Sequence, residues 1–390
     1  MTAPDGEREL LRRTVEDLLA RHCTPARVAA AAAGAGWDAG LWQALEETGL
    51  TLAGSPEEAG GSGGDLLAAA DIAVAAGAAA APVPLAETLA AGMLLGRAGL
   101  AIPSGPLTVA VASGPDAALG SGAGLRSAAG LRRVPYGRLA TTVAAGSAGS
   151  GWDSDWQAVI APAGRGGTGR GGTGRNLAGE PRDEVIFGGD AEVHDVPAGT
   201  ADYARRLLRL FRSLLIAGAA QRALDLTVTY VQEREQFGRP LARFPTVQQE
   251  LARMAGEVAL IGAATQAAVA AEGLAVPGGA AAGDATFARE GVSAVLAAKA
   301  QASHCAGIVA SIAHQLHGAI GTTEEHRLRL TTTRLWSWRD EDGSEAECFA
   351  ELGRAALAAA ARAGTRAGTG AGAGGLWPWL SGSQDAGPAL

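Results

Sequence analysis

The sequence contains little cysteine, little lysine and no excess of positive charge. Its three cysteines, Cys23, Cys305 and Cys348, are scattered and odd in number, so they form neither a zinc-ligand spacing nor a disulfide framework, which favours a reducing cytoplasm. The 40 acidic residues outnumber the 32 basic ones and give a net charge of −8. An acidic chain is poorly suited to a polyphosphate backbone, so nucleic-acid binding is disfavoured. Lys299 is the only lysine, which we interpret as a compositional bias without functional weight.

Long apolar runs are also lacking. The segment Met1–Glu16 is charged and has no apolar core of the kind found in signal peptides. The longest strongly apolar stretches, Ile72–Val83 and Val258–Ala271, are mostly alanine and too short to cross a bilayer. We therefore expect neither a secreted protein nor a membrane-spanning one.

The residues that are present divide the chain into four parts. Residues 1–102 carry the apolar period of α-helices, and we expect helices over Asp5–His22, over Trp37–Leu50, from near Asp65, and over Leu85–Leu100. Residues 103–198 change to short alternating segments bounded by glycine or proline, which predicts a small β-barrel domain. The expected strands are Leu107–Ala112, Leu139–Ala145, Trp156–Ala161, Glu184–Phe187 and Ala191–Val196.

Helical periodicity returns in residues 199–363. One long helix begins near Ala201, a second spans Thr246–Glu272 and a third spans Asp284–His314. A fourth follows a capping-box pattern at Thr322–Glu325, is broken near Asp342–Ser344 and resumes to Ala363. Four long helices with short connections predict an antiparallel four-helix bundle, and residues 364–390 are expected to form a flexible tail. The predicted fold is therefore mainly α with a central β domain.

An arginine-bearing repeat lies inside the β segment, at Gly164–Arg175. It lacks the strand–turn–helix setting and the Lys-Ser/Thr ending of a phosphate-binding loop. We therefore expect a flexible loop there.

Two segments of the bundle carry a family resemblance. Tyr230–Leu241 and Gln315–His326 resemble the most recognisable signatures of the acyl-CoA dehydrogenase family, in the family's order and at about its separation. Pro56–Gly61 resembles a third and weaker signature. The resemblance extends over the whole predicted architecture, although it is faint in the β segment.

The resemblance implies an oxidoreductase that uses FAD. Members oxidise the Cα–Cβ bond of an acyl-CoA or related acyl thioester and pass the electrons to an electron-transfer flavoprotein. A carboxylate base removes the α-proton, the β-hydrogen leaves as hydride, and hydrogen bonds to the thioester carbonyl stabilise the enolate-like charge. The expected assembly is a homo-oligomer or a hetero-oligomer with a related subunit.

The resemblance also implies cofactor-binding residues. Arg234, Gln236 and Phe237 match residues that reach the FAD bound mainly by the neighbouring subunit, and arginine suits the pyrophosphate. Gln315, Gly318 and Ala319 match the turn beside the adenosine and ribityl side. Alone, Arg234 could instead pair with a neighbouring glutamate, and Phe237 could belong to the core. No metal site is expected, because His304, Cys305, His314 and His317 lack a plausible tetrahedral arrangement.

The catalytic base is the first departure from the family. In most members it is a glutamate 27 residues after the motif glutamine, and that position here is Asp342. Aspartate is one methylene shorter, and reactive geometry tolerates little retreat of the base. A second family location falls near Leu208, which cannot act, while Glu341 and Glu345 are neighbouring carboxylates. The alternative for Asp340–Glu347 is a solvated acidic helix face.

Further departures lie in the β segment and before the second bundle helix. The family's Thr-Glu…Gly-Ser stretch has no clear match in Val109–Gly124, and Trp152 and Trp156 lack the usual neighbouring threonine or serine. Phe244 is followed by Pro245, where a glutamine is usual. The residues that match contacts to a neighbouring subunit's FAD are retained in this sequence. The matches to the chain's own flavin contacts and to its base are weaker. This resembles the non-catalytic or half-site partner subunits of heteromeric bacterial acyl-CoA dehydrogenases.

Three functions therefore stay open at this point. They are an acyl-CoA dehydrogenase with Asp342 as base, a partner subunit that lends FAD contacts, and a flavin oxidase, monooxygenase or acyl-carrier-protein dehydrogenase on the same scaffold. The sequence does not identify the acyl chain.

Overall fold

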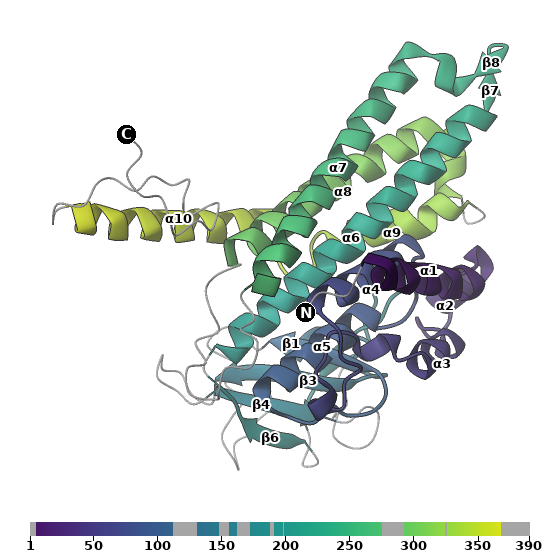
Figure 1. Cartoon of the computed structure of the whole chain (residues 1–390). Helices are drawn as coiled ribbons and strands as arrows, with labels where there is room; N and C mark the ends of the chain where they lie inside the picture. Colours follow the sequence, from purple (N-terminus) through teal and green to yellow (C-terminus); the bar gives the residue numbers. More distant parts are fainter. Residues whose placement is uncertain are drawn as a thin grey trace.

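The computed structural model of the chain describes residues 5–111, 131–147, 156–161, 172–187, 191–197, 199–274, 292–323 and 326–367. The N-terminal helices and the β strands lie together at the foot of a set of long helices (Figure 1). This arrangement confirms the predicted fold class, a mainly helical chain around a small central β region. The expected domain boundaries after residues 102, 198 and 363 stay predictions.

Five helices precede the first strand. They are α1 (Asp5–His22), α2 (Pro25–Ala33), α3 (Ala39–Glu47), α4 (Leu66–Ala78) and α5 (Leu85–Ala98), with short 3-10 turns at Leu50–Leu52 and Glu57–Ala59. Side chains cap three of them, because Thr24, Asp38 and Asp65 each accept a hydrogen bond from a backbone N–H in the first turn. The sequence analysis missed α2, an alanine-rich helix without an apolar period.

Within the described residues, six strands form the central β region. They are β1 (Leu107–Val111), β2 (Leu131–Pro135), β3 (Thr141–Ser147), β4 (Trp156–Ala161), β5 (Arg182–Val185) and β6 (Glu192–Asp195). A four-stranded sheet has the order β1-β3-β4-β6, and β2 pairs with β5 in a second sheet. In the first sheet β1 and β3 are parallel, with Leu107 opposite Thr141, and the other pairs are antiparallel. The sequence analysis missed β2.

The repeat at Gly164–Arg175 is described only from Gly172 onward. Arg175 donates hydrogen bonds to the backbone carbonyls of Ala32 and Gly34, at the end of α2. The described end of this segment is therefore anchored to the N-terminal helices, and the expectation of a flexible loop was wrong for Arg175.

The C-terminal half consists of long helices. They are α6 (Thr200–Glu233), α7 (Pro245–Leu274), α8 (Val292–His317), α9 (Arg327–Trp338) and α10 (Glu345–Ala367). Between α6 and α7 lie a hairpin, β7 (Glu235–Gln236) and β8 (Arg239–Pro240), and a 3-10 turn η4 (Leu241–Arg243); η5 (Gly318–Thr322) follows α8. Helices α6, α7 and α8 pack on one another, while α10 projects from the body (Figure 1).

Some details of this half differ from the expectation. The part of the expected third helix from Asp284 to Gly291 lies outside the described residues, as do Glu324 and Glu325 of the capping box and residues 368–390 of the tail. The observed cap of α9 is His326, whose Nδ1 accepts a hydrogen bond from the backbone N–H of Leu328 at 3.2 Å. Pro245 occupies the first position of α7, where a missing N–H costs nothing.

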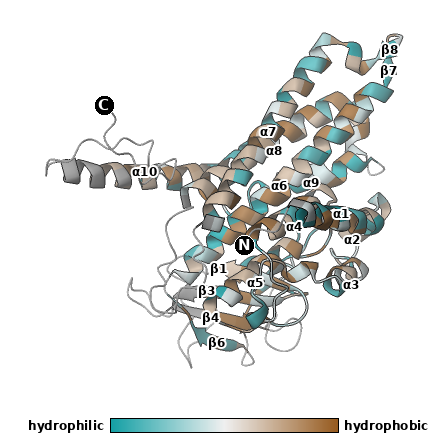
Figure 2. Ribbon diagram, viewed as in Figure 1, coloured by the Kyte–Doolittle hydropathy of each residue, from teal (hydrophilic) through white to brown (hydrophobic). Residues whose placement is uncertain are grey.

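Two bundle helices carry apolar windows longer than the stretches considered in the sequence analysis. By length and composition alone, Pro245–Gly273 and Ser293–Thr322 could cross a membrane. However, α7 and α8 pack against each other and against α6, and 67% of the most apolar α8 window is buried, against 33% of that of α7. Apolar residues are interspersed with polar ones along these helices (Figure 2). Core helices of this kind pass the same test, so the finding is weak evidence for a membrane span.

Helices α4 and α6 cross in backbone contact. A Cβ at Gly77 would lie 2.2 Å from the carbonyl oxygen of Leu215, and one at Gly218 would lie 1.9 Å from that of Val74. Both distances are far below any normal contact, so the crossing needs glycine on both helices. This contact fixes the N-terminal helices against the bundle.

The first prediction tests this crossing. Gly218→Ala should lower the free energy of unfolding by about 3 kcal/mol, because the added methyl group must push the two helices apart. Gly256→Ala, on α7, should instead raise it by about 0.5–1 kcal/mol, since a Cβ there meets nothing within 4 Å and alanine favours the helix. Urea unfolding followed by circular dichroism gives both values. Equal effects of the two substitutions would contradict the backbone contact.

Candidate functional site

The residues singled out by the sequence fall into two places. Arg234, Gln236 and Phe237 lie in the β7–β8 hairpin at the far end of α6, where Figure 1 shows the end of the bundle. Asp342 lies in the turn between α9 and α10, beside the N-terminal half of α6. Arg212, which binds Asp342, is eighteen residues before Tyr230, which places the two about 27 Å apart along α6 at about 1.5 Å per residue.

The hairpin presents its side chains to solvent. Phe237 is 91% exposed and has a φ of +53°, and Gly238 follows with a φ of +77°. The ring of Phe237 lies edge-on to Phe244, over which the Arg239 guanidinium stacks at 4.1 Å. Phe237 is therefore not a core residue. Arg234 and Gln236 are exposed and make no side-chain hydrogen bond or ion pair within the described residues, so the glutamate pairing considered for Arg234 is not formed.

The turn after α8 lies close to the same end of the bundle. Gln315, Gly318 and Ala319 are all exposed, and Gly318 has a φ of +65°. Tyr230 links this turn to α6, because its ring stacks on His317 at 4.3 Å and its hydroxyl donates to the His317 carbonyl at 3.3 Å. Burial lowers the pKa of His317 from 6.5 to about 4, so the stacked imidazole is neutral at pH 7. The two signature segments are thus joined through Tyr230 and His317.

The donor set at this end fits an anionic, planar cofactor. Exposed arginine and glutamine side chains can bind phosphate oxygens, and an exposed phenylalanine offers an apolar face. All three side chains are exposed, and none of them lines the large cleft bounded by α1, α4, α6 and α7. The β-segment residues that would line the chain's own flavin, including Val109–Gly124 beyond Val111 and Trp152, lie outside the described residues.

Asp342 is held by arginines of α6. Its Oδ2 accepts a hydrogen bond from Arg212 Nε at 2.8 Å, and its carbonyl accepts one from Arg209 Nε at 3.2 Å. Arg209 in turn binds Glu351 of α10 through two hydrogen bonds, at 3.1 and 2.8 Å. Asp342 has a φ of +58° and precedes Gly343, so the turn occupies the left-handed region twice. Both its carboxylate and its backbone are therefore fixed.

Arg212 joins three parts of the chain. Besides Asp342, it binds Glu87 of α5 at 3.1 Å and Glu341 at 3.3 Å, and its side chain is 3% exposed. Burial opposes its charge, but the three carboxylates outweigh that effect and raise its pKa well above the ordinary value. Burial raises the pKa of Glu87, although Arg212 and Arg182 act in the opposite direction. Arg212 is thus a permanently charged link between α5, α6 and the α9–α10 turn.

A second arginine extends the network into the β region. Arg182 of β5 binds Glu341 through Nε at 2.8 Å and through NH2 at 2.7 Å, and it also binds Glu180 at 3.0 Å. Burial opposes the ionisation of Glu341, yet Arg182 and Arg212 outweigh it and lower its pKa from 4.5 to about 2. Trp338 completes the group by donating to Glu180 at 2.9 Å. We call the set Glu87, Glu180, Arg182, Arg212, Glu341 and Asp342 the ion network.

Lys299 holds the same turn from α8. Its ammonium donates to the Arg339 carbonyl at 3.0 Å, to the Gly343 carbonyl at 2.7 Å and to Ser303 Oγ at 2.6 Å. Burial lowers its pKa from 10.5 to about 8, although Asp342 acts in the opposite direction. The interpretation of the only lysine as compositional bias was therefore wrong, because it ties the α9–α10 turn to the bundle.

A small cavity of about 10 Å³ adjoins the ion network and is lined by Glu87, Tyr136, Arg212 and Trp338 among others, but not by Asp342. The Asp342 side chain itself is 17% exposed. The solvated acidic face considered for Asp340–Glu347 is wrong for Glu341, which is 9% exposed and fully paired. Glu345 is half-exposed and pairs with His304 at 3.1 Å, away from the network.

Sequence reasoning missed the partners that define this region. Glu87, Arg182 and Arg212 stand in apolar helices or short strands and belong to no motif. The sequence offered one signal for them: Arg212 lies on the inward face of an otherwise apolar helix. Because charges are buried only when paired, such a position predicts a buried acidic partner. Within the described part of the chain, no group of three or more histidine, cysteine or acidic residues could hold a metal ion.

The second prediction concerns the acid side of stability. The folded-state pKa of Glu341 is depressed, so its contribution is complete above about pH 4.5 and is lost as the pH falls towards about 2. At about 1.4 kcal/mol per pKa unit, that loss is about 3 kcal/mol. Glu341→Gln should flatten the fall in unfolding free energy between pH 5 and pH 2.5, and Glu345→Gln should leave it unchanged. Urea unfolding at a series of pH values measures this fall in the free energy of unfolding. Identical slopes of that free energy against pH for wild type and Glu341→Gln would refute the assignment.

Comparisons with known proteins agree with this architecture. A family model described as "Acyl-CoA dehydrogenase, N-terminal domain" matches residues 5–100, and one described as "Acyl-CoA dehydrogenase, C-terminal domain" matches residues 201–345. Acyl-CoA dehydrogenase IpdE2 of Mycobacterium tuberculosis is 32% identical over 342 residues, covering 85% of this chain and 91% of that protein.

Solved structures share the fold. The ChsE4–ChsE5 complex from Mycobacterium tuberculosis contains a chain that matches with a TM-score of 0.72 at 21% identity, covering 90% of this chain and 97% of that one. Butyryl-CoA dehydrogenase from Megasphaera elsdenii matches with a TM-score of 0.70 at 19% identity, covering 92% and 99%. With IpdE2 similar over most of both lengths and both family models in the expected order, this chain belongs to the acyl-CoA dehydrogenase family.

Proposed function

We propose that this chain is a cofactor-lending subunit of a heteromeric acyl-CoA dehydrogenase, and that its own base position does not act in catalysis. The observation that carries the proposal is the ion pair at 2.8 Å between Asp342 and buried Arg212. A general base must lie within hydrogen-bond reach of the proton that it removes. Here the carboxylate is already bound to a guanidinium.

Freeing Asp342 would be energetically costly. Breaking a buried ion pair by removing one partner typically costs about 3–5 kcal/mol, because the remaining charge is left without compensation. The Arg212 guanidinium would retain Glu87 and Glu341, but the turn is also held by Arg209 and Lys299. The aspartate side chain is also one methylene shorter than the glutamate of most members, so it reaches less far from this fixed turn. These constraints favour a structural role for Asp342.

The exposed hairpin supports the lending role. A phenylalanine that is 91% exposed beside an unpaired arginine and glutamine is a surface that another molecule can cover. In the proposed assembly, Arg234 binds the pyrophosphate of a FAD held by the related subunit, Gln236 donates a hydrogen bond to it, and Phe237 covers an apolar face. Gln315, Gly318 and Ala319 are proposed to lie beside the adenosine and ribityl side. FAD, when bound, accepts the hydride that leaves the β-carbon of the acyl thioester.

Similar structures also favour a heteromer. One solved structure in this fold, with a TM-score of 0.72, is titled as the complex of two named chains, ChsE4 and ChsE5. Another, with a TM-score of 0.75, is titled as a Tcur3481–Tcur3483 steroid acyl-CoA dehydrogenase. In the proposed assembly the related subunit contributes the base and the acyl pocket, and electrons pass to an electron-transfer flavoprotein. The proposed location is the cytoplasm.

The third prediction tests whether the chain has an active site of its own. The isolated chain, incubated with FAD and freed of excess, should show no turnover of an acyl-CoA panel with a ferricenium acceptor, because its base is paired with Arg212. Asp342→Asn should leave this result, and the flavin absorption spectrum, unchanged. Steady turnover that Asp342→Asn abolishes would instead identify a self-sufficient dehydrogenase with Asp342 as its base.

The fourth prediction tests the lending role. In the complex with a related acyl-CoA dehydrogenase chain that keeps a glutamate base, Arg234→Ala should weaken FAD retention about tenfold or more, since a hydrogen bond to a charged group is worth about 1.5–3 kcal/mol. Phe237→Ala should act in the same direction. Arg253→Ala, which removes an exposed arginine of α7, is the matched control. Flavin absorbance after gel filtration measures retention. Unchanged retention in both hairpin variants, with the complex intact, would exclude the lending role.

A further inference from the structure

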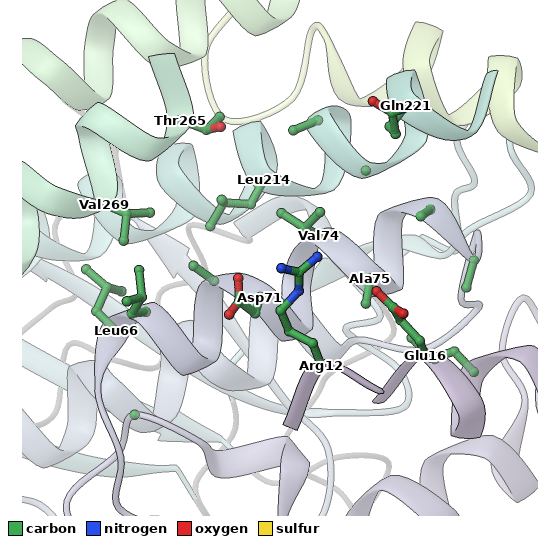
Figure 3. Close-up of a pocket in the computed structure, with 18 of the residues that line it drawn as sticks. Arg12, Glu16, Leu66, Asp71, Val74, Ala75, Leu214, Gln221, Thr265 and Val269 are labelled. Carbon is green, nitrogen blue, oxygen red and sulfur yellow. The ribbon is translucent and has the colours of Figure 1, made fainter. Parts of the chain in front are cut away.

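A large cleft lies on a different side of α6 from the ion network. It is an open cleft of about 2270 Å³ bounded by α1 and α4 on one side and by α6 and α7 on the other. Figure 3 shows Arg12 and Glu16 of α1 and Val74 of α4 on one side, and Leu214 of α6 and Val269 of α7 on the other. At about 100° per residue, Leu214 lies on nearly the opposite face of α6 from Arg212. The cleft is therefore separate from the base position.

The cleft is kept open by small residues. Its floor is the α4–α6 crossing at Gly218, where the two backbones touch. On α7, Gly262 and Gly273 line the cleft, and a Cβ at either would meet nothing within 4 Å. The middle is apolar, with Leu66, Val74, Leu214 and Val269 among its lining residues. The volume exceeds the usual 300–1,000 Å³ of a small-molecule site, so it accommodates a long or bulky ligand.

The acidic residues of the cleft have local contacts of different kinds. Asp71 forms an ion pair with Arg8 of α1 through two hydrogen bonds, at 2.6 and 2.9 Å. Asp65 caps α4 by accepting from the Ala68 N–H at 2.9 Å, and Asp225 accepts from the Gln221 amide at 2.8 Å, so both are hydrogen-bonded by neutral donors. Glu16 lies one turn from Arg12 on α1, and Asp225 lies one turn from Arg222 on α6.

Two arginines on the α6–α9 side of the cleft form no ion pair in the described structure. Arg222 of α6 and Arg327 at the start of α9 both line the cleft, and neither makes a side-chain hydrogen bond or ion pair within the described residues. The lining contains five arginines and four acidic residues, so its formal charge is positive by one, whereas the floor is apolar. An anionic head on a long apolar body complements this combination.

We propose that this cleft binds a long-chain carboxylate, with its head group at Arg222 and Arg327 and its chain along the floor between α4 and α7. This site is independent of the proposed subunit role and of FAD. The bound molecule is a ligand that undergoes no reaction there, because the described lining carries no base or nucleophile positioned on the apolar floor.

The first test blocks the floor. Fluorescence titration of the isolated chain with cis-parinaric acid should show saturable binding, displaced by oleate. Gly262→Phe places a ring in the open space of the cleft and should weaken binding at least tenfold. Gly256→Phe is the matched control, because it lies on the same helix, also faces open space and does not line the cleft. Thermal unfolding of both variants shows whether each is folded.

The second test removes the head-group contacts. Arg222→Gln combined with Arg327→Gln should weaken oleate binding at least tenfold, while Arg253→Gln on the exposed face of α7 should not. Oleyl alcohol should bind the wild type at least tenfold more weakly than oleate. Binding of the alcohol as tight as that of oleate, or equal binding by the double variant, would overturn the carboxylate assignment.

One alternative occupant is a helix of a partner subunit. If no saturable fatty-acid binding occurs, and Gly262→Phe but not Gly256→Phe prevents assembly with a related chain in analytical ultracentrifugation, the proposal is overturned in favour of a protein interface. Failure of fatty-acid binding leaves the FAD-lending experiment unaffected, so the two proposals are tested separately.

Discussion

The structure depends on one buried guanidinium. Arg212 binds carboxylates from α5 and from Glu341 and Asp342 of the α9–α10 turn, so it connects the N-terminal helices to the bundle. Removing such a charge from water costs several kcal/mol, and the cost is recovered only because three acceptors surround it. Arg182 binds Glu341 from the β region, and Lys299 holds the same turn from α8 through its backbone carbonyls. The turn that in the family carries the catalytic base is therefore a point where helices and strands are fastened together.

The ion network and the exposed hairpin occupy separate parts of the chain and perform different tasks. The network binds the Asp342 carboxylate to Arg212, whereas the hairpin at the far end of α6 remains exposed and rich in donors. Helix α6 carries both and keeps them about 27 Å apart. A subunit whose own base position is held in an ion pair, and whose hairpin stays exposed, is suited to completing a site in another subunit. The proposed function follows from this division.

Much of the fold could be predicted from the sequence because the long helices repeat their apolar residues at a regular spacing. The bounds of α1 and β4 match the expectation, and the signature segments identified the family. The alanine-rich α2 and the strand β2 were missed, because neither has a strong apolar period. The ion network could not be predicted, since its members come from α5, α6, β5 and the α9–α10 turn, and only the tertiary structure brings them together. Lys299 was misjudged for the same reason: a single lysine gives no pattern, and its three acceptors are defined only in space.

The flavin content of the assembled enzyme tests the central claim most directly. The complex of this chain with a related catalytic subunit, purified by gel filtration, should be analysed for FAD absorbance against total protein. If this chain lends contacts and holds no FAD of its own, an equimolar complex contains one FAD for every two chains. One FAD for every chain would show that the site beside Asp342 is complete, and would contradict the account.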